Sequence, residues 1–471
     1  MADLLLGVDL GTSGLKLAAF AAGEDVDGAV LAEAEVGYAV QTPRPGWAET
    51  QVSVWRTALD QALAEVAPAL QGHTVRGLGL SGQMHGAVLV DETGTAVGPA
   101  LLWPDQRAAA EVRRWRALPE ADRAALANPL VPGMTGPLLG WLAGHRPELV
   151  ARAAHVLLPK DALRATLVPG TDPAVTDRSD ASATLLWDVP GDCWSAAAVG
   201  AAGVGTGLLP AVRPADSVVG TAHLPGVGEV PVVVGGADTP LALLATGTVG
   251  GLQVNLGTGA QLLRPGARPL PAVEPLVHTY GTAGGASDSG WYAMAAVQNA
   301  GLAWSWVCSV LGLDWPTFVA ALSSAAPGAG GVVFRPFLTG ERGGVAGPDD
   351  RGGWAGLHPG TTSADLARSA LEGVAFAVAA GADLLDSPDD GSPVVLTGGG
   401  GRSPEVQQLL ADVLGRPVQH VRVRSASAAG AALLAGVGVG VTCRPQRELG
   451  PVVEPRPAPA LTAARARWAT G

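Results

Sequence analysis

The sequence predicts an α/β protein built from two similar halves, and three observations support that prediction. Apolar runs with the spacing of strands end in glycine-rich turns, and segments with helical spacing lie between them. The segment 8–17 is echoed in order and residue type by 254–263, later in the chain. A length of 471 residues is enough for two to three domains, each with a sizeable core.

The composition is that of a compact, acidic globular chain. Hydrophobic residues make up 48% of it and charged residues 15%, with a formal net charge of −12. The negative charge argues against nucleic acid or an anionic membrane as a partner. Three scattered cysteines form neither a disulfide framework nor a metal cluster, which favours a reducing cytoplasm. The segment 1–4 has no basic run, so we expect no signal peptide.

One segment, 425–443, carries no charge and could be mistaken for a membrane helix. Its residues are mostly Ala, Gly, Val and Ser, with only Leu433 and Leu434 of any bulk. Membrane insertion relies on larger apolar side chains. We therefore expect a buried, closely packed helix.

The first repeat predicts a hairpin, with strands at 4–10 and 15–20 and a tight turn between them. Such a turn points backbone N–H groups at one spot, together with the hydroxyls of Thr12 and Ser13, and this favours phosphate oxygens. Asp9 adds a carboxylate suited to hydrated Mg²⁺. Without its repeat, the segment could equally be an ordinary glycine-rich hairpin. The position of Lys16, two residues after Gly14 and in a strand pattern, argues against a Walker P-loop.

The next two elements are a helix at 52–70, with apolar residues at helical spacing, and a glycine-rich strand that follows it. The strand contains a formal G-x-G-x-x-G. A dinucleotide fold would need a helix after the first glycine, whereas Leu78 and Leu80 alternate inside the motif. We expect another strand at 87–90.

Two polar clusters follow predicted strands. Gln83, Met84 and His85 could hold a polyhydroxylated ligand, and Trp103 with Asp105 offers the aromatic face and carboxylate that often grip sugars. A core histidine with satisfied hydrogen bonds and an ordinary surface turn are the alternatives. From residue 108 to about 230 we expect helices and short loops inserted in the first half.

Asp238 stands just past a predicted strand, 231–234, after Gly235 and Gly236. That is the usual position for a reactive group in an α/β sheet. A carboxylate there is the base expected when a hydroxyl attacks the γ-phosphate of ATP. Aspartate after two glycines can also form a plain turn.

The second half repeats the hairpin, with Gly257 and Thr258 in its turn. Thr362 and Asp365 predict a capping box for a long helix. A four-glycine loop, 398–401, lies between a strand and a helix that Ser403 caps, and it leaves room for a base or ribose. The tail from Arg444 is expected to pack loosely.

Taken in order, these segments resemble the FGGY family of carbohydrate kinases over nearly the whole chain. The residues that carry the resemblance are Asp9-Leu-Gly-Thr-Ser-Gly14, Pro45-Gly-Trp-Ala-Glu49, Ser81-Gly-Gln-Met-His-Gly86, Trp103-Pro-Asp-Gln-Arg107, Leu158-Pro-Lys-Asp161, Ser179-Asp-Ala-Ser182, Gly235-Gly-Ala-Asp238, Leu256-Gly-Thr258, Gly340-Glu-Arg342, Leu371-Glu-Gly-Val374 and Gly398-Gly-Gly-Gly-Arg-Ser403.

The resemblance implies an α/β fold of two actin-like (ribonuclease H-like) domains with a central cleft for nucleotide and sugar. The expected divisions are an N-terminal domain, 1–245, with the sugar-binding residues and first phosphate hairpin, a C-terminal domain, 246–443, with the second hairpin and adenosine loop, and a tail, 444–471. Within the family, the Gln-Met-His-Gly segment is most similar to xylulokinases. This implies MgATP-dependent phosphate transfer to a ketopentose, D-xylulose before others.

By position, Asp238 matches the family's catalytic base and a substrate-binding residue, and Asp9 matches the acidic residue near Mg²⁺. Met84 and His85 match the sugar-binding pair, and we add the nearby Gln83, Trp103 and Asp105. The residues expected to bind ATP are Gly11, Thr12, Ser13 and Lys16 in the first hairpin, Gly257 and Thr258 in the second, and Gly399, Gly400 and Gly401 in the adenosine loop.

Several positions depart from the usual xylulokinase pattern and put the identity of the sugar in doubt. They are Pro104, Gln106, Ala237, Thr239, Gly259 and the run Arg342-Gly-Gly344. The alternatives are a kinase of ribulose, gluconate or glycerol, and a sugar- or nucleotide-binding homologue that has lost transfer. The expected partners are a small-molecule sugar and MgATP, with no nucleic acid and no membrane. A homodimer stays open.

Overall fold

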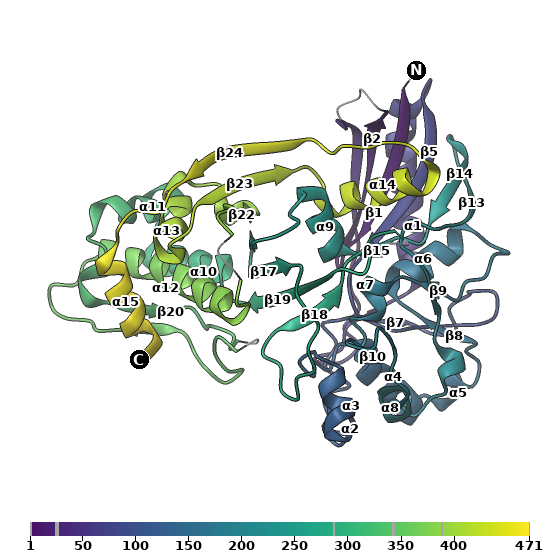
Figure 1. Cartoon of the computed structure of the whole chain (residues 1–471), viewed down its shortest axis with the longest axis horizontal. Coiled ribbons are helices and arrows are strands. Elements are labelled where there is room, and N and C mark those ends of the chain that lie inside the picture. Colours follow the sequence, from purple (N-terminus) through teal and green to yellow (C-terminus); the bar gives the residue numbers. More distant parts are fainter. Residues whose placement is uncertain (1, 24–27, 286–287, 342–343, 388–389, 471) are drawn as a thin grey trace.

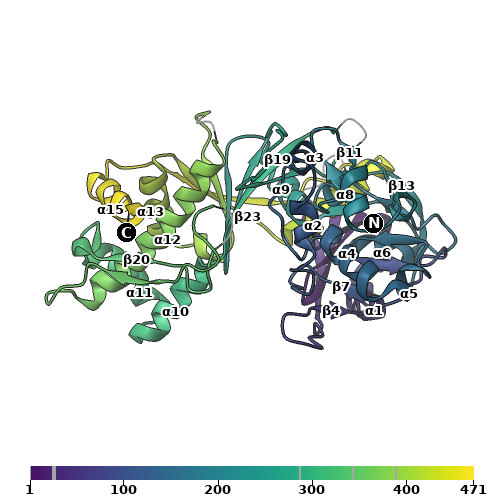
Figure 2. The same cartoon turned by 90° about the horizontal axis from the view of Figure 1, so that it is seen from below.

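The computed structural model describes residues 2–23, 28–285, 288–341, 344–387 and 390–470. Two lobes lie side by side, each built on one seven-stranded sheet of the described residues, with a narrower region between them (Figure 1, Figure 2). The N-terminus belongs to one lobe and the C-terminus to the other. This bears out the predicted two-part α/β architecture.

The first sheet has the order β13-β14-β5-β1-β2-β3, with β15 pairing the end of β5. β1 and β2 form the antiparallel hairpin that the sequence predicts, and β5 runs parallel to β1. The helix α1 (Val52–Leu70) covers this sheet and ends where predicted. The bounds of the strands are β1 Asp3–Leu10, β2 Gly14–Ala22, β3 Val30–Gly37, β5 Thr74–Gly82, β13 Val218–Leu224, β14 Gly228–Val233 and β15 Gly236–Ala237.

The second sheet, of order β18-β19-β17-β16-β22-β23-β24, repeats this plan. In each sheet a hairpin (β1–β2 and β16–β17) is followed by two parallel strands, β5 and β14 or β22 and β23. An antiparallel strand closes each sheet at that edge, β13 in the first and β24 in the second. The sequence repeat is therefore a structural repeat. The bounds are β16 Gln253–Leu256, β17 Ala260–Pro265, β18 His278–Gly281, β19 Trp291–Val297, β22 Val394–Thr397, β23 Val418–Val423 and β24 Arg447–Val453.

Two helices of the C-terminal lobe begin at the predicted caps. α12 has the capping box of Thr362 and Asp365, and α13 begins after Ser403 and ends at Gly415, which has a φ of 65°. The bounds of these and the neighbouring helices are α10 Gly301–Leu311, α11 Trp315–Ser324, η2 Ala329–Gly331, α12 Ser363–Leu384, η3 Gly399–Gly401 and α13 Pro404–Leu414, beside the small pair β20 Val333–Arg335 and β21 Gly353–Ala355.

The uncharged segment forms α14 (Ala426–Val439), a buried helix as expected, and it packs on β1 and β5 of the first lobe. The approach is close because both strands carry glycine there. A Cβ at Gly7 would lie 1.8 Å from the Ala428 carbonyl oxygen, and one at Gly79 would lie 2.0 Å from that of Ala431. Together with α9 (Asp238–Thr246), α14 ties the two lobes together.

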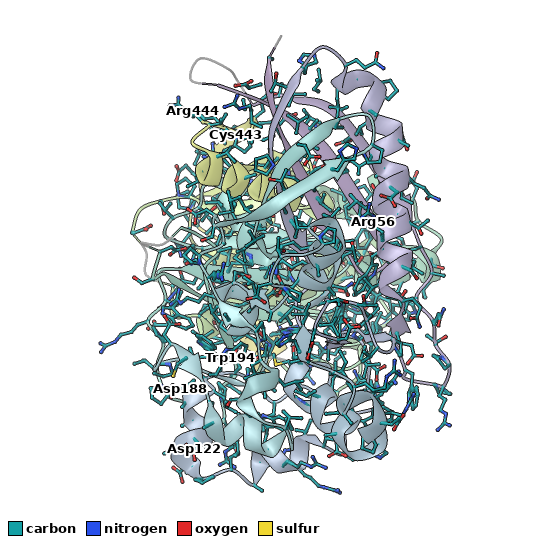
Figure 3. The ribbon with its side chains drawn as sticks, turned by 90° about the vertical axis from the view of Figure 1, so that its right-hand side faces the viewer. Arg56, Asp122, Asp188, Trp194, Cys443 and Arg444 are labelled. Atoms are coloured by element: carbon teal, nitrogen blue, oxygen red, sulfur yellow. The ribbon has the colours of Figure 1, made fainter. Side chains whose placement is uncertain are left out.

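The layer between residues 108 and 217 contains the predicted short helices, together with two-stranded ribbons that were not predicted. Figure 3 shows Asp122, Asp188 and Trp194 in this layer, at the end of the lobe opposite Cys443 and Arg444. The bounds are β4 Glu49–Thr50, β6 Val88–Val90, β7 Ala100–Leu101, α2 Val112–Arg116, α3 Glu120–Ala125, α4 Thr135–His145, α5 Pro147–Val150, β8 His155–Leu157, α6 Pro159–Leu167, β9 Val175–Thr176, α7 Arg178–Ala181, β10 Trp187–Asp188, β11 Cys193–Trp194, α8 Ala196–Ala201, η1 Thr206–Leu208 and β12 Ala211–Val212.

Two expectations about secondary structure are wrong. The segment 218–230 is part of the hairpin β13–β14 rather than a loop region, because its alternating residues complete the edge of the first sheet. The tail after Arg444 does not pack loosely. It adds β24 to the second sheet and forms α15 (Pro459–Thr470), whose Leu461, Ala464 and Trp468 are buried.

In the part of the chain that the structure describes, no single helix is long and apolar enough to cross a membrane. The only candidate there is α10 taken together with α11, and this pair is bent by 92°.

Candidate functional site

Each of the two predicted phosphate turns is closed by a backbone hydrogen bond, across four residues in the first turn and three in the second. In the first, Gly11 N donates to the Gly14 carbonyl at 2.9 Å, and in the second, Gly257 N donates to that of Gly259 at 2.8 Å. The second turn is packed against the start of α10, where Gly301 N donates to Gly257 O at 3.1 Å. A Cβ at 259 would lie 2.7 Å from the Val297 carbonyl oxygen, so the second turn has no room for a side chain at this position.

Both hairpins contribute to one cavity of about 510 Å³. Asp9 and Lys16 enter it from the first hairpin, and Asn255 and Gln261 from the second. Strand residues next to both turns therefore line one shared space, as two halves that close on one ligand require. Its remaining lining comes from Glu33, Thr239, Ala242, Thr246, Gln253, Leu263, Thr397, Gly398, Gly399, Arg402 and the run from His420 to Ser427.

The glycine loop closes one side of this cavity. Gly399 is exposed, and a Cβ on it would meet nothing within 4 Å, so this residue leaves open space beside the cavity. Gly400 and Gly401 pack instead against Leu256 and Leu396, where a Cβ would lie 2.9 and 2.6 Å from their side chains. A flat group can therefore lie against bare backbone at Gly399, while its two neighbours hold the loop on the sheet.

Asp9 is a half-buried carboxylate at the end of β1. Ser81 Oγ donates to it at 2.9 Å, and Lys16 lies opposite it across the hairpin. Burial raises the pKa of Asp9, against the opposing influence of Ser81 and Lys16. Lys16 itself pairs with Glu35 at 3.1 Å. Ser81 thus holds the carboxylate of Asp9 in place, while the ammonium group of Lys16 pairs with Glu35.

Asp238 is the first residue of α9, directly after the short strand β15 that pairs with the end of β5. Its Oδ1 accepts from Thr239 N at 2.6 Å and from Thr239 Oγ1 at 3.2 Å. Burial, and after it the charge of Asp9, raises the pKa of Asp238 to about 7. A carboxylate of this pKa can accept a proton near neutral pH.

The predicted sugar-binding pair lies against two tyrosines of the second sheet. The Tyr292 hydroxyl lies 3.9 Å from Met84 Sδ, and the ring of Tyr280 lies 6.0 Å from that of His85. His85 Nδ1 is 2.5 Å from the Ala183 carbonyl oxygen, and burial lowers the pKa of His85 to about 4. The imidazole is therefore neutral, with Nδ1–H as donor.

Gln83 lies between the phosphate turn and this pair. Its Nε2 donates to the Gly11 carbonyl at 3.0 Å, whereas its buried Oε1 has no partner among the described residues. An orphaned buried acceptor costs free energy unless a ligand or water satisfies it. The amide nitrogen of Gln83 is therefore fixed by the phosphate turn, and its amide oxygen can accept a hydrogen bond from a ligand.

Trp103 and Asp105 have roles that the sequence alone did not suggest. The indole Nε1 of Trp103 donates to Thr12 Oγ1 at 2.8 Å, so this residue contacts the phosphate turn. Asp105 is fully buried, and its carboxylate accepts from Ala48 N at 2.7 Å and pairs with Arg107 at 2.8 Å. Direct binding of sugar by Asp105 stays a prediction, and the contacts favour a supporting role.

Sequence reasoning missed the tyrosines. The chain has only three, and each contacts a predicted site residue: Tyr38 donates to the Gly11 carbonyl at 2.5 Å, and Tyr280 and Tyr292 lie against His85 and Met84. Their scarcity was the one signal that could have singled them out. Arg342, which belongs to a quoted motif, lies outside the described residues.

The residues present fit a magnesium ion that shares its ligands with phosphate. In the described ranges, no group of three or more His, Cys, Asp or Glu side chains could enclose a metal. Asp9, whose pKa is raised by burial, instead supplies a carboxylate beside the cavity, and its charge acts on Asp238. Mg²⁺ commonly binds through one or two carboxylates, waters and substrate phosphates.

Comparison with known proteins places the chain in context. Residues 4–245 match the N-terminal domain, and residues 252–439 the C-terminal domain, of the FGGY family of carbohydrate kinases. A xylulose kinase of Escherichia coli is 32% identical over 455 residues, which are 95% of this chain and 91% of that protein. A glycerol kinase of Methylibium petroleiphilum is 31% identical, over 93% of this chain and 91% of its own length.

Solved structures show the same fold over the full length. A crystal structure of a "xyloylose kinase" from Brucella ovis superimposes with a TM-score of 0.89 at 30% identity, covering 99% of this chain and 98% of that one.

Proposed function

The chain belongs to the FGGY family of carbohydrate kinases, and we propose that it transfers phosphate from ATP to D-xylulose, giving D-xylulose 5-phosphate. That the enzyme is an ATP-dependent sugar kinase follows from the family. The choice of sugar is supported by the xylulose kinase relatives and by the Met84–His85 pair. The glycerol kinase relative supports a polyol as the second candidate acceptor.

One observation supports the chemistry more than any other: Asp238 lies between the two predicted subsites. On one side, the charge of Asp9 contributes to its raised pKa. On the other side, Asp238 contributes to the raised pKa of Tyr292, whose hydroxyl contacts Met84. A carboxylate in this position can take a proton from an alcohol held beside Met84 and His85.

In the proposed reaction, the Asp238 carboxylate accepts the proton of the sugar's 5-hydroxyl as that oxygen attacks the γ-phosphorus of ATP. The new P–O bond forms while the bond from the γ-phosphorus to the β,γ-bridging oxygen breaks, and ADP leaves. The N–H groups of the two glycine turns stabilise the charge on the phosphate oxygens. Movement of the two lobes towards each other would exclude water, which competes as an acceptor.

The proposal includes Mg²⁺ near Asp9, with Asp238 close by. When bound, the ion would neutralise negative charge on the triphosphate. Asp9 is kept in position by Ser81, whose hydroxyl donates to it at 2.9 Å. A homodimer and a cytoplasmic location stay predictions.

The pKa of Asp238 predicts the pH dependence of the reaction. The base must be ionised, and its pKa is raised to about 7, so kcat/KM for the sugar should rise with pH and level off above about 7. Because the charge of Asp9 raises this pKa, Asp9→Asn should move the acidic limb to lower pH. The profile is measured at low MgATP between pH 5.5 and 8.5. A flat profile, or a limb that moves to higher pH in Asp9→Asn, would contradict the assignment.

A panel of acceptors tests the identity of the sugar that receives the phosphate. ADP release is followed with D-xylulose, D-ribulose, gluconate and glycerol at saturating MgATP. We expect the highest kcat/KM for D-xylulose, by about tenfold or more, since a site that hydrogen-bonds substrate hydroxyls discriminates strongly. A preference for glycerol would transfer the assignment to the second candidate. Binding of sugar and nucleotide without ADP release would instead identify a homologue that has lost transfer.

A further inference from the structure

The one-turn helix α7 holds two backbone N–H groups that belong to different sheets. Ser179 Oγ accepts from Ala237 N of β15 at 2.9 Å, and Ser182 Oγ accepts from Gly281 N of β18 at 2.8 Å. Figure 1 shows α7 next to β15 and β18. Both serines are buried, with exposed fractions of 0% and 1%. The same kind of contact is thus made twice, once to the residue before the proposed base and once to the residue after Tyr280 in β18.

The first of these contacts fixes the backbone that carries Asp238. Ala237 is the residue before Asp238 and the N-cap of α9, and it is fully buried. Its N–H points at Ser179, so the hydroxyl satisfies a donor that would otherwise be buried without a partner. The position of the Asp238 backbone therefore depends on the position of Ser179 Oγ.

Ser179 is itself anchored to a buried charge cluster. Its hydroxyl donates to Asp177 Oδ2 at 2.5 Å, and the other oxygen of Asp177 pairs with Lys160 Nζ at 3.1 Å. Lys160 is fully buried and also pairs with Asp161 at 2.7 Å and Asp180 at 3.0 Å. These contacts fix the side chains of Lys160, Asp177 and Ser179 relative to one another, so the three residues form one unit.

The unit of Lys160, Asp177 and Ser179 packs against the end of β5, next to β15 and Asp238. A Cβ at Gly82 would lie 2.7 Å from Lys160 Cβ, so the lysine stem packs directly on the end of β5. Gly82 pairs with Ala237, and Arg164 donates to the Val234 carbonyl at 3.0 Å just before β15. The cluster therefore holds the segment 234–237 from several sides.

We propose that Ser179 is a positioning residue for the reaction: held by Asp177 and Lys160, it fixes Ala237 N and thereby the carboxylate of Asp238. This inference rests on the proposed role of Asp238 as base. A displacement of about 1 Å at a reacting group can lower a rate about 10²-fold. Loss of the Ser179 hydroxyl should therefore slow the chemical step without weakening the binding of ATP or of the sugar.

The test compares Ser179→Ala with Ser182→Ala in the full-length protein. Each variant removes a buried hydroxyl from α7 or its C-cap and leaves one backbone N–H without its acceptor. Both melting temperatures should fall, and that of Ser179→Ala should fall further, because this variant also removes a donor to Asp177. For Ser179→Ala we expect kcat about 10- to 100-fold lower, with KM for ATP and D-xylulose within about threefold of the wild type. For Ser182→Ala we expect kcat within about threefold of the wild type.

A Ser179→Ala variant with undiminished kcat, or equal losses of kcat in both variants, would overturn the proposal. If Ser179→Ala does not fold, Ser179→Cys keeps nearly the same volume with a weak acceptor, and its kcat should fall at least about threefold. An unchanged kcat there overturns the proposal as well. No transfer by the wild type to any sugar would overturn the proposed function together with this inference, whereas an active wild type isolates the role of Ser179.

Discussion

Asp238→Asn is expected to lower kcat for phosphate transfer by about 10²- to 10⁴-fold, the usual contribution of general-base catalysis. The amide keeps the size of the side chain but cannot accept the proton of the attacking hydroxyl. Affinity for ATP should change little, because Asp238 is not among the residues that line the cavity beside the loop at Gly399. Single-turnover kinetics and ATP titration measure the two effects separately.

Asp122→Asn is the matched control for this variant. Asp122 lies on α3 in the layer of short helices, at the end of the lobe opposite Cys443 (Figure 3). The same chemical change there should leave kcat and the affinity for ATP as in the wild type. If Asp238→Asn kept more than about a third of the wild-type kcat, Asp238 would not be the base.

Lys160→Met is expected to lower the free energy of unfolding by about 3–5 kcal/mol, the range for removing one partner of a buried ion pair. Three carboxylates, of Asp161, Asp177 and Asp180, lie within 3.1 Å of Lys160 Nζ, and all four side chains are buried. Without the ammonium group these charges repel one another where water cannot screen them. Urea denaturation at pH 8 measures the loss.

The chain offers a matched control, because Lys16 is its only other lysine. Lys16 pairs with Glu35 across the first hairpin, and their side chains are 33% and 68% exposed. Lys16→Met should therefore cost only about 0–1 kcal/mol. Burial raises the pKa of Asp180, so protonation relieves the repulsion in Lys160→Met as the pH falls, and the deficit should shrink towards pH 5. A loss below about 1 kcal/mol at pH 8 would contradict this account of the cluster.

Local signals in the sequence predicted most of the fold. The glycine turns at Gly11 and Gly257 end short apolar runs, and the cap at Ser403 stands beside the helix it begins. Each such signal lies within a few residues of the structure that it specifies. The repeated hairpin then indicated that the chain has two similar halves. The strand orders of the two sheets agree with this.

The contacts that join distant segments could not be predicted in this way. Trp103 was expected to offer its face to a sugar, yet its indole donates to Thr12, 91 residues away in sequence. The tail after Arg444 is rich in Pro and Arg, but its strand β24 pairs with the edge of β23. The position of Ser179 beside Ala237 depends on the packing of α7 between two sheets, which no local pattern records.

The central claim is that this chain moves the γ-phosphate of ATP to a sugar hydroxyl in the space between its two halves. Phosphorus NMR of the wild-type protein with MgATP and D-xylulose tests it most directly. The account predicts a new phosphomonoester coupled to the protons on C5, formed in amounts equal to ADP. Inorganic phosphate as the sole product, or no loss of ATP with D-xylulose or any other sugar of the panel, would contradict it.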